Sequence, residues 1–258
     1  MPLFRTQGIV LRARDLGERD RLVTLFTRDL GKLTAVARGA RGIRSRFGGG
    51  LELFTCGDAV GFEREGRELL RLDHFDIRHS FSRLREDLER LGQGARMVEA
   101  LARLTAERDP HPACFALLLR ALRALETGSP ARVQLAFTLR LLDLTGHRPR
   151  LDRCVGCGRL VGTTAVAFDP DGGVVCGACR APGQRPISPR ALGVLRGLQA
   201  AGWEARLTAR IASAVEGEAA TVLDGYLAAL SGSALRTPRF LAQTMAAAGL
   251  RGESDKSG

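Results

Sequence analysis

The sequence predicts an α+β protein of several domains, in which a small β-barrel is followed by a helical bundle that a cysteine-bearing β module interrupts. Three observations support this fold class. The first 80 residues form short strand-like segments, apolar residues recur at helical intervals from about residue 81, and two Cys-x-x-Cys pairs lie in the middle of the chain. At 258 residues the chain is long enough for two or three domains.

Residues 1–80 are predicted to form a closed barrel. The candidate strands are residues 4–12, 21–27, 32–38, 59–62 and 68–72. An antiparallel sheet of this size removes its exposed edges when it closes on itself. We therefore expect an OB-fold barrel.

Positive charge is concentrated in one segment of this barrel. Between residues 32 and 46 there are five basic residues and no acidic ones, and glycines surround them. The five are Lys32, Arg38, Arg41, Arg44 and Arg46. A flexible and uniformly positive loop can follow a phosphate backbone, so we expect these residues to bind nucleic acid. The net charge of +11 agrees with this, although a cationic surface that only improves solubility is the alternative.

Two neighbouring features of the barrel each have two interpretations. Phe47 can stack on a base, or it can pack into its own domain. Asp15, Glu18 and Asp20 can bind a metal ion, or they can form a solvated hairpin tip among the arginines beside them. Because the chain has one Trp and one Tyr, we expect binding that depends on charge and is indifferent to base sequence.

The helical pattern begins near residue 81. Its first segment covers residues 84–102, with Gly92 and Gly94 as the expected weak point. A second helix ends at Gly128. A third begins at Pro130 and is apolar on nearly every side, which is typical of a helix in the centre of a bundle.

More helices follow the cysteine-bearing module. Ser188 and Pro189 have the form of an N-cap and a proline at the first helical position. Two further helices are expected at residues 219–230 and from Thr237. The helical domain is therefore predicted to comprise residues 81–150 and 185–250, with a disordered tail at 251–258.

The interrupting module, residues 151–184, carries four cysteines with the spacing of a metal site. They are Cys154, Cys157, Cys176 and Cys179, with 18 residues between the two pairs. A predicted strand, turn and strand between the pairs folds the second pair back onto the first. We expect a zinc ribbon in which all four thiolates bind one structural Zn²⁺, because a catalytic zinc would keep an open position.

Three other uses of these cysteines are possible: two disulfides, a redox Cys-x-x-Cys motif and an iron–sulfur cluster. The N-terminus has no apolar signal region, so we expect a cytoplasmic protein, and disulfides are rare in that compartment. A redox motif needs only one pair, and an iron–sulfur cluster remains the main alternative. Cys56 and Cys114 are expected to be small buried side chains. No run of about 18 apolar residues exists, so no membrane span is predicted.

Several strings of residues are recognisable in order along the chain. They are LGERD at 16–20, LFT at 25–27, GK at 31–32, ARGAR at 37–41, SRFGG at 45–49, FTLRLLDLTGHRP at 137–149 and LRTPRFL at 235–241. Together these strings resemble the RecO family of bacterial recombination-mediator proteins. The resemblance covers nearly the whole chain: the N-terminal barrel, the central helix that leads into the ribbon, and the C-terminal helix.

The resemblance implies a DNA-repair protein without catalytic activity. Members of this family bind single- and double-stranded DNA, anneal complementary strands, and with RecR help to load RecA. They also contact the acidic C-terminal tail of the single-stranded-DNA-binding protein. The family's DNA contacts would fall here on the five basic residues of the barrel. Because some members lack the four cysteines, the zinc would stabilise the fold without being the centre of the activity.

The tail of the single-stranded-DNA-binding protein is acidic with a hydrophobic end, so its receptor should combine an apolar groove with a basic rim. Arg132 and Arg140, beside the apolar helix from Val133, are the candidates for this rim. The alternative is that both arginines cap or solvate the helical bundle.

Two functions from other classes remain open at this point. A zinc-ribbon RNA-binding or transcription factor would share the barrel, the charge and the ribbon. A metal-dependent nuclease would need clustered carboxylates, and only the acidic turn at residues 15–20 approaches that pattern. The glycine-rich run at Gly48 is not followed by the residues of a phosphate-binding P-loop, so no nucleotide hydrolysis is expected.

Overall fold

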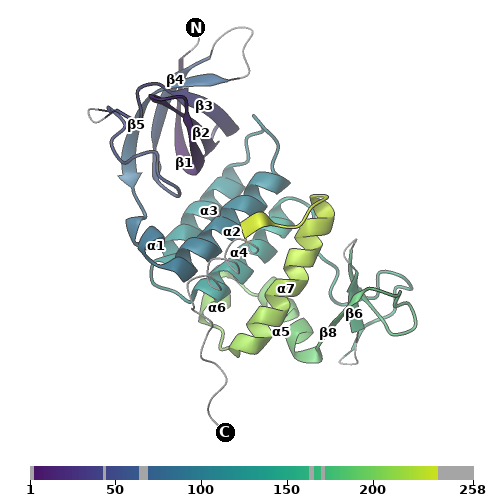
Figure 1. Ribbon diagram of the computed structural model, residues 1–258. Helices are drawn as coiled ribbons and strands as arrows, with labels where there is room; N and C mark the ends of the chain where they lie inside the picture. Colours follow the sequence, from purple (N-terminus) through teal and green to yellow (C-terminus); the bar gives the residue numbers. More distant parts are fainter. Residues whose placement is uncertain (1–2, 43–44, 64–68, 163–165, 170–171, 238–258) are drawn as a thin grey trace.

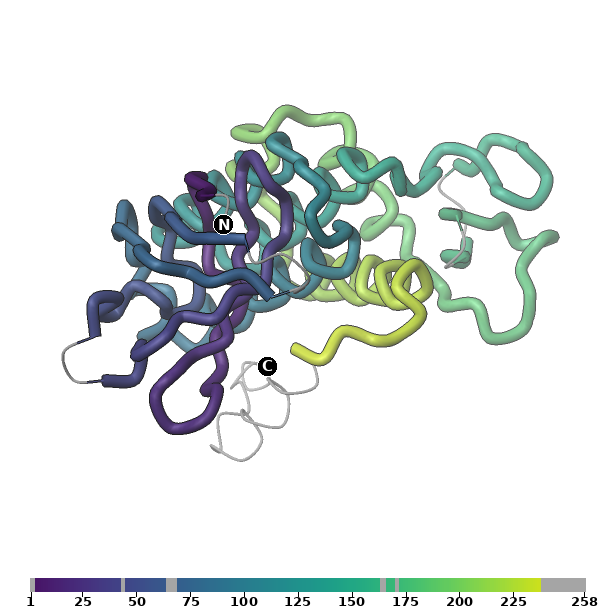
Figure 2. Tube along the Cα trace, turned by 90° about the horizontal axis from the view of Figure 1, so that it is seen from above, coloured from purple at the N-terminus to yellow at the C-terminus, as the bar shows by residue number. Residues whose placement is uncertain are grey.

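The computed structural model describes residues 3–42, 45–63, 69–162, 166–169 and 172–237. A β-barrel and a small three-stranded sheet lie on opposite sides of a helical domain (Figure 1). The same order is seen from above (Figure 2). The predicted α+β fold class is therefore confirmed, with its barrel, helical region and four-cysteine module.

Five strands form the closed barrel in the order β1-β2-β3-β5-β4. Their bounds are β1 (Leu3–Leu16), β2 (Asp20–Thr27), β3 (Gly31–Ala37), β4 (Cys56–Phe62) and β5 (Leu70–His79). All neighbours are antiparallel except β3 and β5, which pair in parallel. This Greek-key barrel is the OB-fold that the strand pattern predicted. Strand β5 continues to His79, well past its predicted end at Leu72.

The loop after β3 folds back over the barrel and contributes to its core. Phe47 is 2% exposed and packs with Leu33, Leu72 and Phe75. Its backbone amide donates to Ser45 Oγ at 3.2 Å, which helps to hold the loop in this position. Packing of Phe47 within its own domain is therefore confirmed, and base stacking by this ring is wrong.

The described residues contain seven α-helices. Their bounds are α1 (Ser82–Glu86), α2 (Leu88–Leu104), α3 (Pro112–Leu125), α4 (Pro130–Leu144), α5 (Pro189–Ala200), α6 (Trp203–Thr208) and α7 (Ser213–Leu230). Helix α4 is buried on nearly every side and contacts α2, α3, α5, α6 and α7, as its apolar sequence predicted. Helix α6 was not predicted from the sequence. The described chain ends at Thr237, so the predicted last helix and the tail at 251–258 lie outside it.

The first helical segment breaks at a different place from the one predicted. Helices α1 and α2 meet at Asp87, whose side chain accepts the backbone amide of Arg90 at 3.0 Å and caps α2. Gly92 and Gly94 both lie inside α2, so the predicted weak point is wrong. A Cβ atom on Gly94 would lie 2.7 Å from the ring of Phe54, so the absence of a side chain lets the barrel pack closely on the helix.

A short backbone joint connects the barrel to the helical domain. Lys32 pairs with Glu107 in an isolated β-bridge, and the amide of Arg108 donates to the carbonyl of Lys32 at 2.9 Å. Gly31 has φ +69°, and a Cβ there would lie 2.2 Å from the carbonyl oxygen of Asp109. The β2–β3 turn is thus seated against the loop after α2, which fixes the barrel's orientation.

The ribbon, residues 150–187, contains strands β6 (Val166–Asp169), β7 (Gly173–Val175) and β8 (Arg185–Ile187) in the order β7-β6-β8. The predicted hairpin is present, and β8 is an additional strand. Phe168 packs on Tyr226 of α7 with ring centroids 5.6 Å apart. Ser188 caps α5 by accepting the amide of Ala191, as predicted. Within the described residues, none of the helices is both long and apolar enough to cross a membrane.

Candidate functional site

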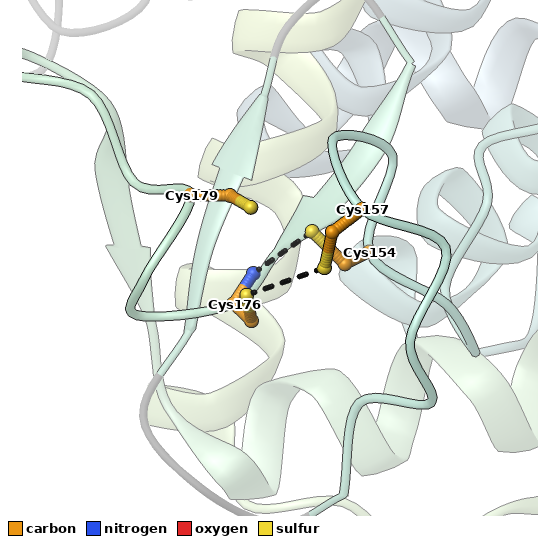
Figure 3. A group of neighbouring side chains, drawn as sticks. All are labelled: Cys154, Cys157, Cys176 and Cys179. Carbon is orange, nitrogen blue, oxygen red and sulfur yellow. Dashed lines mark hydrogen bonds between the residues drawn. The ribbon is translucent and has the colours of Figure 1, made fainter.

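The four cysteines of the ribbon converge on one point (Figure 3). Their sulfur atoms all lie within 4.8 Å of one another, and Sγ of Cys157 is 3.8 Å from Sγ of Cys176. Zinc–thiolate bonds of about 2.3 Å in a tetrahedron place the sulfurs about 3.8 Å apart. The spacing of the sulfurs therefore fits four-coordinate binding of a single ion.

Local backbone geometry holds each Cys-x-x-Cys pair in a tight turn. The amide of Gly158 donates to the carbonyl of Cys154 at 2.9 Å, and the amide of Cys179 donates to the carbonyl of Cys176 at 3.0 Å. Gly158 has φ +73°, a conformation that favours glycine. A Cβ on Gly156 would lie 3.3 Å from Sγ of Cys179, so a side chain there would crowd the sulfurs. These two glycines therefore let the backbone turn tightly around the sulfurs.

The electrostatics of the cluster favour a bound cation. The backbone amide of Cys176 donates to Sγ of Cys154 at 3.4 Å and, with the amides of Cys157 and Gly156, lowers the pKa of Cys154 to about 6. The pKa of Cys179 is raised instead, because neighbouring thiols hydrogen-bond to it and a second thiolate beside Cys154 would be repelled. A divalent cation removes this conflict by stabilising every thiolate.

All six cysteines are free thiols in the structure, which contradicts the disulfide alternative. Cys56 and Cys114 are buried as expected, and burial raises the pKa of each to about 11. The four ribbon cysteines are thus the group that can hold a metal ion such as zinc.

Lys32 is engaged in contacts between the two domains. Its Nζ donates to the carbonyls of Ala102 and Thr105 at 2.6 and 2.9 Å, at the end of α2. It also lies 3.4 Å from a carboxylate oxygen of Glu107, and its side chain is 12% exposed. These contacts favour a structural role for Lys32 over a contact with nucleic acid.

The arginines of the loop after β3 are more accessible. Arg38 is exposed and makes no hydrogen bond or ion pair within the described part of the chain. Arg41 donates to the carbonyl of Gly17 at 2.7 Å and lies 3.2 Å from Asp15. Arg46 lies over the ring of Phe47, 5.3 Å from its centroid. Arg44 falls outside the described residues.

The acidic turn does not assemble a metal site among the described residues. Asp15 faces Arg21 and Arg41 at 3.4 and 3.2 Å, and Asp20 accepts the backbone amide of Gly39 at 2.9 Å. The ribbon cysteines form the one group of potential metal ligands found in the described ranges. The carboxylates of the turn therefore behave as parts of a solvated hairpin tip, which was the alternative to a nuclease site.

The structure gives Arg132 and Arg140 different environments. Arg132 forms an ion pair with Glu216 of α7, and the two side chains are 13% and 8% exposed. Its Nε donates to Oε1 of Glu216 at 2.7 Å, so it is held between helices. Arg140 is 45% exposed, pairs with Asp143 and lines an open groove.

This groove, the α3–α4–α6 groove, has a volume of about 510 Å³. Apolar side chains and arginines both line it; Arg120 and Arg140 are exposed, whereas Arg206 is buried. Its lining includes Leu117, Leu144, Trp203, Arg120, Arg140 and Arg206. Arg120 lies over the ring of Trp203, 5.5 Å from its centroid, and also pairs with Glu204 at 2.6 Å. The groove thus combines an apolar lining with the exposed guanidinium groups of Arg120 and Arg140.

Sequence reasoning missed the residues that complete these sites. Trp203 was missed because the short helix α6 gave no periodic signal, and Arg120 on α3 was missed because its partner Trp203 comes from that helix. Arg71 and His74 lie beside Arg46 through their common contact with Asp73. Arg71 lies inside the predicted strand but was not singled out, and His74 lies beyond its predicted end at Leu72. The basic residues Arg71, His74 and Arg78 follow one another in the sequence and could have indicated a longer basic strand.

Comparison with known proteins decides the family. The model described as "Recombination protein O N terminal" matches residues 1–81, and "Recombination protein O C terminal" matches residues 85–239. The chain belongs to the RecO family. The resemblance seen in the sequence is therefore confirmed, and the two RecO models together span the barrel, the helices and the ribbon.

Curated RecO relatives support this over most of the chain. The "DNA repair protein RecO" of Anaeromyxobacter dehalogenans (strain 2CP-C) is 41% identical over 246 residues, which cover 93% of this chain and 96% of the relative. The protein of the same name from Rubrobacter xylanophilus is 40% identical over 206 residues, 78% of this chain and 82% of the relative. That of Desulfitobacterium hafniense (strain Y51) is 37% identical over 204 residues, covering 77% and 74%.

Proposed function

We propose that this protein is a non-catalytic recombination mediator in DNA repair. It binds single- and double-stranded DNA, anneals complementary strands, and with RecR helps to load RecA onto DNA coated by the single-stranded-DNA-binding protein. The observation that carries this proposal is a RecO-type OB-fold barrel in which the segment from residue 32 to residue 46 bears accessible arginines and no acidic residue.

Annealing needs no active site in this proposal. Two complementary strands repel each other through their phosphates, and a cationic surface that neutralises part of this charge lowers the barrier to their encounter. Base pairing then supplies the favourable free energy. Arg38 and Arg46 contribute to such a surface, Arg41 extends it, and Lys32 supports it from the joint with α2. Arg44, which lies outside the described residues, is proposed to add its charge to the same interface.

A fluorescence annealing assay without nucleotide tests the proposal. Two complementary labelled oligonucleotides should anneal faster with the protein than without it, and both should remain intact in the presence of Mg²⁺. Arg38→Glu should reduce the acceleration, whereas Arg190→Glu, an exposed position at the start of α5, is the matched control. Cleavage of the strands would indicate a nuclease, and binding restricted to RNA loops would indicate an RNA-binding factor.

The α3–α4–α6 groove is the proposed receptor for the acidic tail of the single-stranded-DNA-binding protein. Its apolar lining suits the hydrophobic end of the tail, and Arg120 and Arg140 suit the acidic residues before it. Arg132 would act indirectly, because its pair with Glu216 holds α4 against α7. Calorimetric titration with the tail peptide should show binding that Arg140→Glu weakens and Arg190→Glu leaves unchanged.

The ribbon cluster is proposed to bind one structural Zn²⁺. Cys154, Cys157, Cys176 and Cys179 would fill all four positions, so the ion would stabilise the ribbon without contacting a substrate. Metal analysis of the purified protein should find one zinc per chain. Iron in place of zinc would identify the iron–sulfur alternative. The proposed location is the cytoplasm, where the thiolates stay reduced.

A further inference from the structure

Strand β5 carries an irregularity that changes which side chains face outward. Val60 pairs with His74 and Gly61 pairs with Leu72, so Asp73 is an extra residue on β5, a β-bulge. Leu72 is buried on one side of it and Phe75 is 4% exposed on the other. The bulge therefore places Asp73 and His74 next to each other on the outer side of the barrel, between two core residues.

Three basic side chains converge on the Asp73 carboxylate. Arg46 from the loop after β3 lies 3.2 Å from Oδ1, and Arg71 from β5 lies 3.5 Å from the same oxygen. Nδ1 of His74 lies 3.0 Å from Oδ2. With His74 neutral, the cluster of two guanidinium groups and one carboxylate still has a net positive charge.

Both guanidinium groups retain unused hydrogen-bond donors. Each guanidinium has five N–H donors, and neither is bound to Asp73 in the bidentate manner that would use two of them. Nε of Arg71 is buried and has no hydrogen-bond partner among the described residues. The side chains of Arg46 and Arg71 are 41% and 36% exposed, so a ligand can reach them from solvent.

We propose that Arg46 and Arg71 together bind one backbone phosphate of single-stranded DNA, and that Asp73 is the positioning residue that holds them side by side. A phosphodiester offers several acceptor oxygens, which matches two guanidinium groups with free donors. The site lies beside Arg38, because Ala37 at the end of β3 pairs with Leu72. It deepens the proposed function and rests on it, because it extends the DNA path from the loop onto β5.

The test is the salt dependence of binding, measured by fluorescence anisotropy with the full chain and a labelled oligothymidylate. For single strands the slope of log affinity against log salt is roughly −0.7 per phosphate neutralised. Arg71→Gln should reduce the slope by that amount, so that its loss of affinity between 50 and 200 mM salt is about 2.6-fold smaller than that of the unmodified protein. Arg190→Gln is the control and should leave the slope unchanged.

Two further variants test the shared phosphate and the positioning role. The double variant Arg46→Gln/Arg71→Gln should lose no more slope than Arg71→Gln, because both side chains hold the same phosphate. Asp73→Asn should also lose slope, although it makes the barrel more positive. If DNA affinity rises and the salt slope does not fall, Asp73 only reduces the positive charge of the surface. That result would overturn its positioning role.

The outcomes separate this site from the proposed DNA interface as a whole. If Arg38→Glu weakens binding and Arg71→Gln behaves like Arg190→Gln, the phosphate site is refuted and the interface stands. If neither variant changes binding, the interface itself is refuted.

The final experiment replaces chloride by inorganic phosphate at constant ionic strength and measures DNA binding again. If phosphate weakens DNA binding only in proteins that retain Arg71, the result supports the site. If phosphate binds but Arg71→Gln does not change DNA binding, the site binds the free anion and the proposal is overturned.

Discussion

Replacing Lys32 by methionine distinguishes a structural role of this side chain from a role in DNA binding. Lys32→Met keeps a long unbranched chain but removes the ammonium group. In the structure this group donates to two carbonyls at the end of α2, Ala102 at 2.6 Å and Thr105 at 2.9 Å. Such carbonyls have no partner within the helix, so the variant leaves them without their donor.

The size of the effect follows from these contacts. Hydrogen bonds to a charged group each contribute about 1.5–3 kcal/mol, and a cation at a helix C-terminus adds about 0.3–1 kcal/mol. The contact with Glu107 adds little, because that carboxylate is 60% exposed. Water can reach part of the site and rescue one carbonyl. We therefore expect Lys32→Met to lower the free energy of unfolding by about 2–4 kcal/mol.

Urea unfolding followed by circular dichroism measures the change, and anisotropy with a labelled oligonucleotide measures DNA binding. The exposed Arg38→Met is the control, with a stability change within about 0.5 kcal/mol and a reduced salt slope. Lys32→Met should show the reverse: lower stability and an unchanged slope. Unchanged stability together with a smaller salt slope of DNA binding would refute the reasoning and would indicate that Lys32 contacts DNA.

Three other changes have defined outcomes. Cys154→Ser should release the bound metal and lower the melting temperature, because it removes one of four ligands; full metal retention by elemental analysis would contradict the site. Phe137→Ala, at a fully buried position of α4, should cost about 3–5 kcal/mol, while Leu160→Ala, which is 71% exposed, should change the urea midpoint little. Burial raises the pKa of Glu99, but hydrogen bonds from the Arg236 amide and from the Thr237 amide and hydroxyl lower it overall below 4.5. The stabilisation that ionised Glu99 gives to the fold is therefore fully present above pH 4.5 and is lost as the pH falls below that value. The difference in urea midpoint between Glu99→Gln and the unmodified protein should shrink from pH 7 towards pH 4. A constant difference would show that ionisation of Glu99 does not contribute to stability.

Features that depend on short stretches of sequence were predictable. The spacing of the four cysteines, with glycines at Gly156 and Gly158, contains nearly everything that the ribbon turns require. The Ser188 cap likewise needs only its own helix. The apolar character of α4 predicted its central position because a helix without a polar face has to be surrounded.

Features that depend on contacts between distant segments were not predictable. Lys32 belongs to a basic run in the sequence, but the fold carries it to the end of α2. Gly94 meets Phe54 of the barrel, a contact that helix propensity does not report. The bulge at Asp73 interrupts the two-residue alternation of β5, so the strand signal stops at Leu72 and the basic cluster around Asp73 stays hidden.

The single tryptophan and the single tyrosine of this chain occupy separate places of interest. Trp203 lines the α3–α4–α6 groove beneath Arg120, and Tyr226 packs edge-to-face on Phe168 of the ribbon. Intrinsic emission excited at the indole band therefore arises at the groove alone, without an attached dye. The near-ultraviolet circular dichroism of the Tyr226 phenol arises at the contact between the ribbon and α7. Each region thus contains its own spectroscopic reporter, and occupancy of the groove can be followed independently of the integrity of the ribbon.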